Sequence, residues 1–484
     1  MPPKSRDEDE KVSLIRLPKG RSPQDIEQAI RNVAPEFVGS LLTWLHDDWY
    51  AVAPDVTQFS ATSTGSPLTH LESAGAAGFQ EVDVATYGKI VAMRDVQGGE
   101  SSASLRDRDL PRGVFVDPPT YWWPGQYMGR TVKLDWHLAA VGIPDAWEQL
   151  GPSGPAAYAS VIVGHIDTGY SEHPALGWGA PGGTWLRTNL GKNYWKDRVD
   201  PLAYSEGYDR WNIEPEYPGP RDNLSGPFGG HGTRTSGVLS GLYAPDDQSL
   251  EYPFFGSAPG VPMIPYRITN SVLIDHVPDL LAKAIRDAIS LGAQVISISL
   301  GAARRSKAVA KAVNDAYRAG VIVCAAAGNV VRPVIYPGRF NCVITVGGAT
   351  TPDGRKFFPW RGASRGDSVD VSGPADQIRR PSTVISKGKE RFIISGPGDG
   401  TSFATALCAG VAALWLAKRS TELDASYGPQ RWARVAAFKQ LIMSTAFVPT
   451  NWPTSEYGTG VFDAGALLKA ALPPLNSLEQ ETDM

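Results

Sequence analysis

The chain contains few cysteines and has no strong excess of either charge. Its 484 residues include only 3 cysteines, and 46 lysines and arginines stand against 50 aspartates and glutamates, for a net charge of -4. Cys324, Cys342 and Cys408 each lie in an apolar run, so we expect core positions and no disulfide framework. The small net charge gives no basic footprint, and we expect neither nucleic acid nor a membrane as a partner.

Long hydrophobic runs are also missing. No window reaches the roughly 18 uninterrupted apolar residues that a membrane-spanning helix needs. The amino terminus, MPPKSRDEDEKVSL, is polar and of mixed charge, without the apolar segment of a signal peptide. The sequence therefore predicts a cytoplasmic protein, with export left open, and it leaves the oligomeric state unknown.

Short apolar runs alternate with helical patterns from about residue 133 onward. The runs ASVIVGHID, QVISISLG and GVIVCAAAGN are typical of buried strands, whereas VPDLLAKAIRDAISLGA has apolar residues at helical spacing. Strands that alternate with helices indicate an α/β fold with a mostly parallel sheet between helices. In such sheets functional groups gather at the carboxyl ends of the strands.

Changes in composition divide the chain into four parts. Residues 1–96 predict a small α+β amino-terminal domain, and residues 97–132, which begin with QGGESSASLRDRDLPR, predict a linker and lead-in segment. Residues 133–470 form the larger α/β domain, and the polar tail 471–484 is expected to fray. Within the larger domain, residues 177–229 are rich in Gly, Pro and Trp and predict an insertion packed on its own aromatics.

Four polar residues lie at element ends within the larger domain. Asp167 and Asn329 end buried strands, and His231 and Ser402 begin helices after glycine-rich segments. Singly, each has an ordinary interpretation as a turn, cap or structural residue. Together they provide a hydroxyl nucleophile, a base, a carboxylate to orient the base and a donor for a developing oxyanion.

The segments around these residues resemble those of the subtilisin-like serine peptidases, or subtilases. The resemblance lies in HIDTGYSEHPAL, GGHGTRTSG, AAAGN and DGTSFATALCAG, in the order Asp, His, Asn, Ser, and it covers roughly residues 133–470. It implies a three-layer fold and a serine endopeptidase that forms an acyl-enzyme. Ser402 would be the nucleophile, His231 the general base and then acid, and Asp167 the residue that orients the imidazole. Asn329 and the Ser402 backbone N–H would hold the oxyanion.

The resemblance also implies a substrate cleft and a role for the first domain. Six residues in two segments would line the cleft: Ser299, Leu300, Gly301, Ala326, Ala327 and Gly328. Substrates would be proteins or peptides, and the chemistry would need no cofactor and no metal, with a structural calcium ion left open. Many relatives carry a propeptide in the position of residues 1–96, so we expect self-cleavage between about Gln97 and Gly125.

Two departures from the family pattern keep an alternative open. Arg234 replaces the family's second histidine, and Ala406 and Leu407 replace a Pro-His pair after the nucleophile, which leaves the local backbone of that helix uncertain. The alternatives are a catalytically weak or inactive subtilase fold that binds peptides, and a hydrolase that uses the same triad on esters. A metallohydrolase is disfavoured, because the sequence has no H-E-x-x-H motif and no paired C-x-x-C motif.

Overall fold

The computed structural model describes most of the chain after residue 130 and short stretches before it. The described residues are 11–16, 28, 42–46, 49–52, 78–83, 120–122, 131–195, 219–222, 224, 228–244, 253–351, 356–386, 389–395 and 398–483. Most of the predicted linker, including the expected cleavage region apart from residues 120–122, lies outside them.

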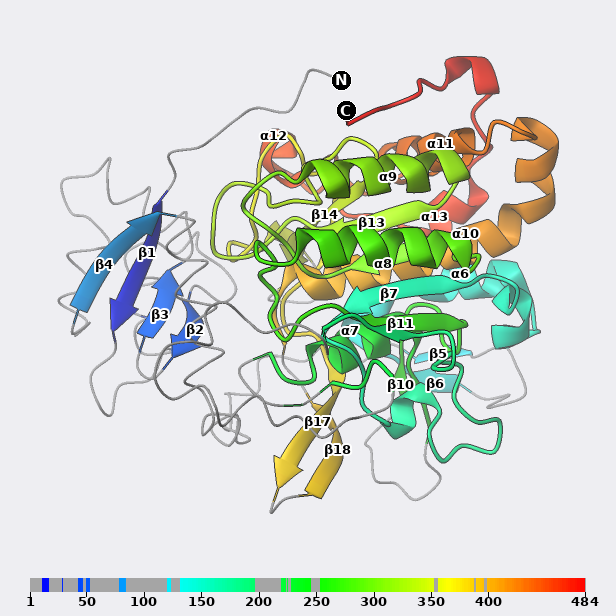
Figure 1. Cartoon of the computed structure of the whole chain (residues 1–484). Coiled ribbons are helices and arrows are strands. Elements are labelled where there is room, and N and C mark those ends of the chain that lie inside the picture. The colour runs from blue at the N-terminus through cyan, green and yellow to red at the C-terminus, as the bar shows by residue number, and fades with distance from the viewer. Residues whose placement is uncertain are drawn as a thin grey trace.

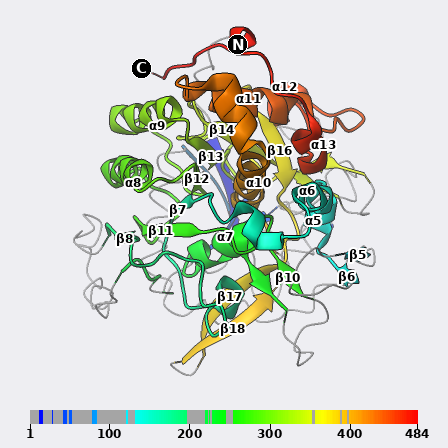
Figure 2. The ribbon, with the colours of Figure 1, turned by 90° about the vertical axis from the view of Figure 1, so that its right-hand side faces the viewer.

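An eight-stranded sheet crosses the larger domain in the described chain (Figures 1 and 2). Its order is β15-β14-β13-β12-β7-β11-β8, and β16 also pairs with β14. The strands are β7 (Val163–Asp167), β8 (Lys192–Asn193), β11 (Met263–Arg267), β12 (Val295–Ile298), β13 (Ile322–Ala326), β14 (Ile344–Thr350), β15 (Phe358–Pro359) and β16 (Val371–Pro374). All pairings are parallel except that of β15. The predicted mostly parallel sheet is therefore confirmed.

Successive strand residues enter two different cores, because side chains of a strand alternate between the faces of the sheet. Val295 and Ile322 belong to the core that also contains α10 (Thr401–Tyr427), whereas Ile296 and Val323 belong to the core beneath α8 (Pro278–Ser290) and α9 (Lys307–Ala319). The other α-helices of the described residues are α5 (Trp136–Ala139), α6 (Ile143–Leu150), α7 (His231–Ser240), α11 (Trp432–Ser444), α12 (Thr454–Tyr457) and α13 (Ala464–Lys469). Helices on both faces of the sheet give the three-layer α/β architecture that the sequence predicts.

The helix α10 is the central element of one core. By length and composition it is the one helix in the described chain that could cross a membrane, but 89% of its most apolar window is buried inside the protein. It is therefore a core helix, and small residues such as Ala404, Ala409 and Ala412, all fully buried, allow neighbours to pack closely. The helix continues without a break through Ala406 and Leu407, where the family pattern has proline and histidine.

Short strands precede the larger domain. β1 (Lys11–Arg16), β2 (Leu42–His46), β3 (Trp49–Val52) and β4 (Gly78–Asp83) form a separate antiparallel sheet in the order β2-β3-β1-β4. β5 (Thr120–Trp122) and β6 (Thr131–Lys133) pair with each other. β1–β4 lie within the proposed amino-terminal domain, whereas β5 and β6 lie at the predicted linker and lead-in segment. The predicted helix of the first domain lies outside the described residues except for Gln28. The domain boundaries stay predictions.

The carboxyl-terminal tail is docked, so the expectation that it frays is wrong. The carboxylate of Asp483 accepts hydrogen bonds from the backbone N–H groups of Asn341, at 2.6 Å, and Cys342, at 2.9 Å. Farther back, the hydroxyl of Tyr427 donates to the carbonyl of Pro473 at 2.8 Å. The tail therefore provides hydrogen-bond acceptors for backbone N–H groups in the loop before β14. Because these partners are distant in the chain, no local sequence pattern indicates the contact.

The described part of the tryptophan-rich insertion packs against the larger domain, not only on its own aromatics as predicted. The ring of Trp178 stacks on Tyr170 with centroids 5.2 Å apart. Trp185 donates from Nε1 to Oγ of Ser240 at 3.1 Å. Both tryptophans contact the core that contains α10, so this part of the insertion belongs to the main domain.

A buried ammonium group connects α11 with the sheet and the tail. Lys439 is 5% exposed, and its Nζ lies 3.4 Å from a carboxylate oxygen of Asp370 and 3.4 Å from one of Glu481. Burial alone would lower the pKa of Lys439, but the two carboxylates outweigh burial and hold the pKa above its usual value. The stabilisation is therefore present below the ordinary pKa of lysine and is lost only as the pH rises through the higher value of the folded state.

We expect Lys439→Ala to lower the free energy of unfolding by about 3–5 kcal/mol, because it leaves Asp370 as a buried carboxylate without its cation. The measurement is urea-induced unfolding near pH 7. The matched control is Lys311→Ala, which removes a largely exposed partner of Asp315 and should cost less than about 1 kcal/mol. Equal effects of the two substitutions would contradict a stabilising role for the buried cluster.

Candidate active site

The carboxylate of Asp167 is at the end of β7 and is fully buried. Its Oδ1 accepts hydrogen bonds from Nδ1 of His231 and from the backbone N–H of Thr168, both at 2.7 Å. Its Oδ2 accepts from Oγ1 of Thr235 at 3.1 Å. Burial by itself would raise the pKa of Asp167, but His231, the nearby His165 and the hydrogen bond from the Thr168 N–H outweigh burial and lower the pKa. The carboxylate is thus held in its ionised form.

His231 is the first residue of α7, directly after Gly230 in the left-handed region with φ 74. A Cβ atom on the next residue, Gly232, would lie 2.0 Å from the carbonyl oxygen of Gly169, in the turn after β7. A glycine is therefore required for the start of α7 to approach the end of β7 this closely. The same approach brings the imidazole of His231 to the carboxylate of Asp167.

Ser402 is the second residue of α10, so it is not the N-cap; Gly400 occupies that position. Oγ of Ser402 lies 3.3 Å from Nε2 of His231, on the side of the imidazole opposite Asp167. The same hydroxyl lies 3.3 Å from the carbonyl oxygen of Ser299, and Oγ of Ser299 donates to the carbonyl of Ser402 at 3.0 Å. The end of β12 and the start of α10 are thereby joined.

Asn329 lies after β13 and beside the glycine-rich approach to α10. Its Oδ1 accepts hydrogen bonds from the backbone N–H of Thr401, at 2.9 Å, and from the Thr401 hydroxyl, at 3.0 Å. Its Nδ2 is 3.4 Å from the position that a Cβ on Gly400 would occupy. Because Thr401 binds the amide oxygen, Nδ2 is the atom that can donate next to Ser402.

The two predicted cleft segments lie close to these groups. Ser299, Leu300 and Gly301 follow β12, and Ser299 contacts Ser402 directly as described above. The second segment, Ala326–Gly328, ends β13 and leads into Asn329. Gly301 is already paired, since its N–H donates to Val272 and its carbonyl accepts from Ile274. The role of both segments as walls of a substrate cleft stays a prediction.

Several residues that support the site were missed by the sequence analysis. Asp222 accepts hydrogen bonds from Oγ1 of Thr168, at 2.6 Å, and from the backbone N–H of Gly230, at 2.9 Å, so it joins the turn after β7 to the start of α7. Burial raises the pKa of Asp222, although hydrogen bonds from Thr168 and the backbone N–H of Leu224 oppose the shift. Asp222 lies inside the predicted insertion, where no local pattern marks it. Thr235 could have been found, because it lies four residues after His231 on the same helix face.

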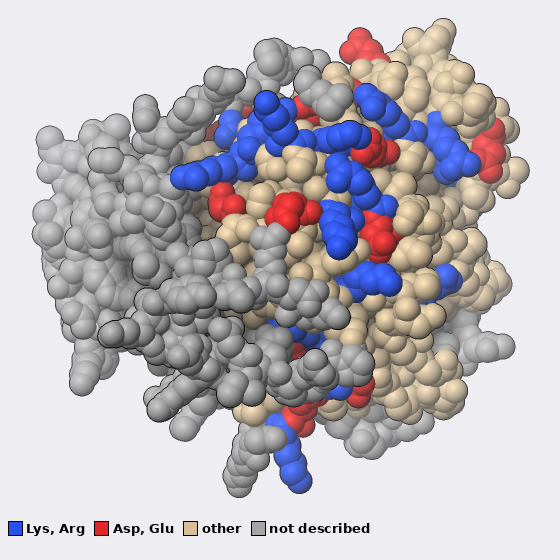
Figure 3. Space-filling view, in the orientation of Figure 1, with Lys and Arg blue, Asp and Glu red and all other residues tan. Residues whose placement is uncertain are grey.

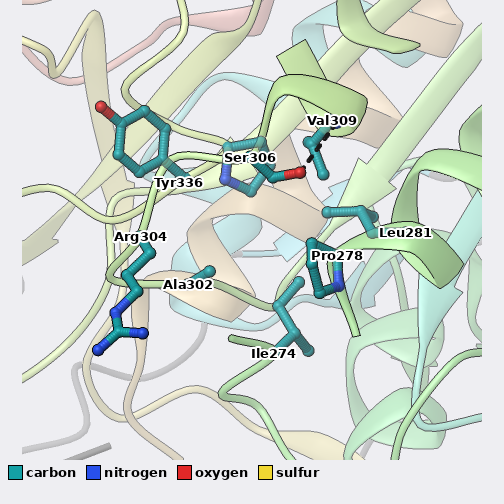
Figure 4. Close-up of a pocket in the computed structure, with 9 residues that line it drawn as sticks. Ile274, Pro278, Leu281, Ala302, Arg304, Ser306, Val309 and Tyr336 are labelled. Atoms are coloured by element: carbon teal, nitrogen blue, oxygen red, sulfur yellow. Dashed lines mark hydrogen bonds between the residues drawn. The ribbon is translucent and has the colours of Figure 1, made fainter. Parts of the chain in front are cut away.

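An apolar pocket lies near the first cleft segment (Figure 4). It opens to solvent, with about 230 Å³ of empty space when the open solvent is included, and is lined by Ile274, Pro278, Leu281, Ala302, Arg304, Ser306, Val309, Tyr336 and Pro337. Ala302 directly follows Gly301, and its backbone pairs with that of Tyr336. The pocket therefore continues from the wall predicted to line the cleft.

A metal site was not expected from the sequence. Among the described residues, no group of three or more His, Cys, Asp or Glu side chains is arranged to hold a metal ion.

Comparison with known proteins identifies the family to which the chain is similar. The model of the subtilase family matches residues 159–465. Subtilisin DY from Bacillus licheniformis is 31% identical over 212 residues, which are 43% of this chain and 70% of that protein. Subtilisin E from Bacillus subtilis (strain 168) is 30% identical over 200 residues, which are 40% of this chain and 48% of that protein.

A solved structure has a similar fold. Fervidolysin from Fervidobacterium pennivorans, described as a keratinolytic enzyme related to subtilisin, aligns with a TM-score of 0.51 and 19% identity. The alignment covers 96% of this chain and 61% of that chain, and it supports the fold alone. Because the family model matches more than half of its length, this chain belongs to the subtilase family of serine endopeptidases.

Proposed function

We propose that this chain hydrolyses peptide bonds of protein substrates with Ser402 as the nucleophile, His231 as general base and acid, and Asp167 as the residue that orients His231. The observation that carries the proposal is the relay of hydrogen-bonding groups, 2.7 Å from Asp167 to His231 and 3.3 Å from His231 to Ser402. A hydroxyl is a weak nucleophile until an adjacent base accepts its proton, and the relay supplies that base.

In the first half of the reaction, Oγ of Ser402 attacks the scissile carbonyl while Nε2 of His231 accepts the hydroxyl proton. The ionised carboxylate of Asp167 stabilises the imidazolium that forms and holds its Nδ1–H in position. His231 then donates the proton to the leaving amine, and an acyl-enzyme on Ser402 remains. In the second half, water repeats the attack with the same base, and Ser402 is released.

The negative charge on the carbonyl oxygen would be stabilised at the start of α10. Nδ2 of Asn329 is one proposed donor, and the backbone N–H of Ser402 is the other. The N–H groups of the first turn of a helix have no acceptors within the helix, and its dipole favours a negative charge at that end. Ser402 therefore has two proposed roles in the first turn of α10. Its Oγ is the nucleophile, and its backbone N–H is part of the oxyanion site.

An inactive, peptide-binding subtilase is not favoured. Arg234 and the pair Ala406 and Leu407 depart from the family pattern, but none of them replaces a member of the relay, and α10 keeps its helical backbone through the second site. The nucleophile, the base, the orienting carboxylate and the oxyanion donor all lie together. A subtilase that had lost catalysis would not be expected to retain all four groups.

The apolar pocket is the proposed site for a substrate side chain on the acyl side of the scissile bond. Figure 4 shows Ile274, Pro278 and Leu281 around the hollow, with the guanidinium of Arg304 directed away from them. An aliphatic side chain that packs against these residues would remove apolar surface from water, which is favourable by about 25 cal/mol per Å² of apolar surface.

The amino-terminal unit is proposed to be a propeptide that the enzyme removes. The separate antiparallel sheet of β1–β4 precedes the part of the chain that the family model matches. Between the two, the stretch from Gln97 to Arg112 is rich in small and charged residues and poor in apolar ones, which suits an exposed tether for cleavage.

We expect Ser402→Ala and His231→Ala each to lower kcat by about 10⁶-fold, and Asp167→Ala to lower it less, sizes known for the corresponding residues of subtilisin. Asn329→Ala should cost about 10²- to 10³-fold, again by analogy with subtilisin. Turnover of a fluorogenic peptide measures these effects, and Ser290→Ala, at an exposed position on α8, is the control.

A serine-directed fluorophosphonate should add once to the wild type, as measured by intact mass. An adduct that persists on Ser402→Ala would assign the nucleophile elsewhere.

We expect purified wild type to lose its amino-terminal unit by a cut between about Gln97 and Gly125, while Ser402→Ala stays at full length. Intact mass and the sequence of the new amino terminus check this. A wild-type protein that keeps its full length while it cleaves peptides would show that the unit is a permanent domain.

We expect leucine to be preferred over aspartate by about tenfold or more in kcat/KM at one of the positions two to five residues before the scissile bond, because an apolar pocket discriminates by roughly this much. Ala302→Leu, which partly fills the pocket, should reduce the preference. Ala308→Leu, at an exposed position on α9, is the matched control. An unchanged preference in Ala302→Leu would remove the pocket from substrate binding.

A further inference from the structure

The side chain of Arg234 lies between α7 and the hairpin formed by β17 (Arg380–Ser386) and β18 (Lys389–Ser395), which projects from the domain in Figures 1 and 2. Gly230, Arg234 and Gly237 share one face of the helix start. A Cβ on Gly237 would lie 1.9 Å from Cγ of Pro381, and one on Gly230 would lie 3.4 Å from Nη1 of Arg234. The hairpin therefore packs against the face of α7 that carries Arg234, one turn after His231.

Arg380, the first residue of β17, approaches the same place from the hairpin. Its Cζ lies 5.5 Å from the ring centroid of Phe403, the residue that follows Ser402. A Cβ on Gly398 would lie 2.4 Å from this Cζ, so the guanidinium fills the space beside the loop that leads into α10. Both arginines keep part of their surface exposed.

The charges of the two guanidinium groups are only partly compensated. The carboxylates of Asp222 and Asp167 act on Arg234, and that of Asp399 acts on Arg380. Arg234 donates from Nη1 to the carbonyl of Gly229 at 2.8 Å, and Arg380 from Nη1 to that of Ile378 at 3.4 Å. Within the described residues neither guanidinium forms an ion pair, and the buried Nε of Arg380 has no hydrogen-bond partner. Burial, together with the charge of Arg234, lowers the pKa of Arg380 to about 10, although the charge of Asp399 opposes the shift. An anion held by both arginines would relieve this repulsion.

The arginines lie on the side of Ser402 where the leaving group departs. The general base must donate its proton to the leaving amine, so that side is the side of His231 and α7. The predicted acyl-side walls and Asn329 instead follow β12 and β13, which are neighbours in the sheet. The seam between α7 and β17 therefore borders the part of the substrate that follows the scissile bond.

We propose that Arg234 and Arg380 form a carboxylate-binding site that makes the enzyme prefer aspartate or glutamate at the first or second position after the scissile bond. The inference rests on the catalytic roles proposed above. Guanidinium groups suit a carboxylate because their planar donors match its two oxygens and their charge strengthens the hydrogen bonds. The competing interpretation is that Arg380 only packs on Phe403 and supports the loop before α10.

The test compares internally quenched peptides that differ only in aspartate or asparagine at these two positions. We expect wild type to favour aspartate by about 10-fold or more in kcat/KM, the usual size of an effect from a hydrogen bond to a charged group. In Arg380→Gln and Arg234→Gln the ratio of the two kcat/KM values should fall toward one. Arg380→Lys should keep part of the preference, because the charge remains.

The matched control is Arg318→Gln, at an exposed position on α9. Lys and Arg residues gather over α8 and α9 in Figure 3, so this variant removes the same charge from a surface that is already basic. It should keep the wild-type ratio. A wild-type ratio of one would overturn the proposal. So would glutamine variants that slow both peptides equally and keep the ratio, because that result assigns Arg234 and Arg380 a structural role alone.

A binding measurement separates this proposal from the proposed function. Calorimetry with Ser402→Ala gives the Kd of each peptide without turnover, and the aspartate peptide should bind more tightly by about 10-fold. Adding Arg380→Gln to Ser402→Ala should abolish the difference, and a persistent difference would overturn the inference. Failure of the proposed function appears differently, as an active-site serine that takes up no fluorophosphonate.

Discussion

A buried carboxylate is stable in its ionised form only when donors surround it, and the site is built around this requirement at Asp167. β7 carries the carboxylate into the interior, and α7 brings two donors, from His231 and Thr235, to its oxygens. The start of α7 can approach the turn after β7 this closely because Gly232 has no side chain that would clash with the carbonyl of Gly169. Asp222 then joins the turn after β7 to the start of α7. The hydrogen bond that His231 donates to the buried carboxylate of Asp167 also fixes the orientation of its imidazole.

The helix that fills one core also presents the serine. α10 is buried along most of its length, and its first turn holds Thr401 and Ser402, which bond to residues following β13 and β12. A shift of α10 within the core would therefore move Ser402 relative to both His231 and Asn329. Close packing resists such shifts, so the stability of the core and the geometry of the site depend on the same contacts.

The sequence predicted the elements of this arrangement better than their connections. Buried strands alternating with helices indicated the parallel sheet, and the polar residues at strand and helix ends marked Asp167, His231, Asn329 and Ser402. Thr235 was detectable at helical spacing from His231, but Asp222 was not, because its partners lie 54 and 8 residues away and in different elements. The tail was expected to fray for the same reason, since its polar residues find their partners only in the folded domain.

By itself, the sequence determined the family, the order of the four site residues and the elements that carry them, because hydrophobic period and glycine placement are local properties. Only the tertiary structure decided that Asp222 supports the start of α7, that the tail closes against the loop before β14, and that Arg380 lies beside Phe403. These contacts join residues far apart in the chain, and they follow from which strands and helices pack together. No single segment carries that information.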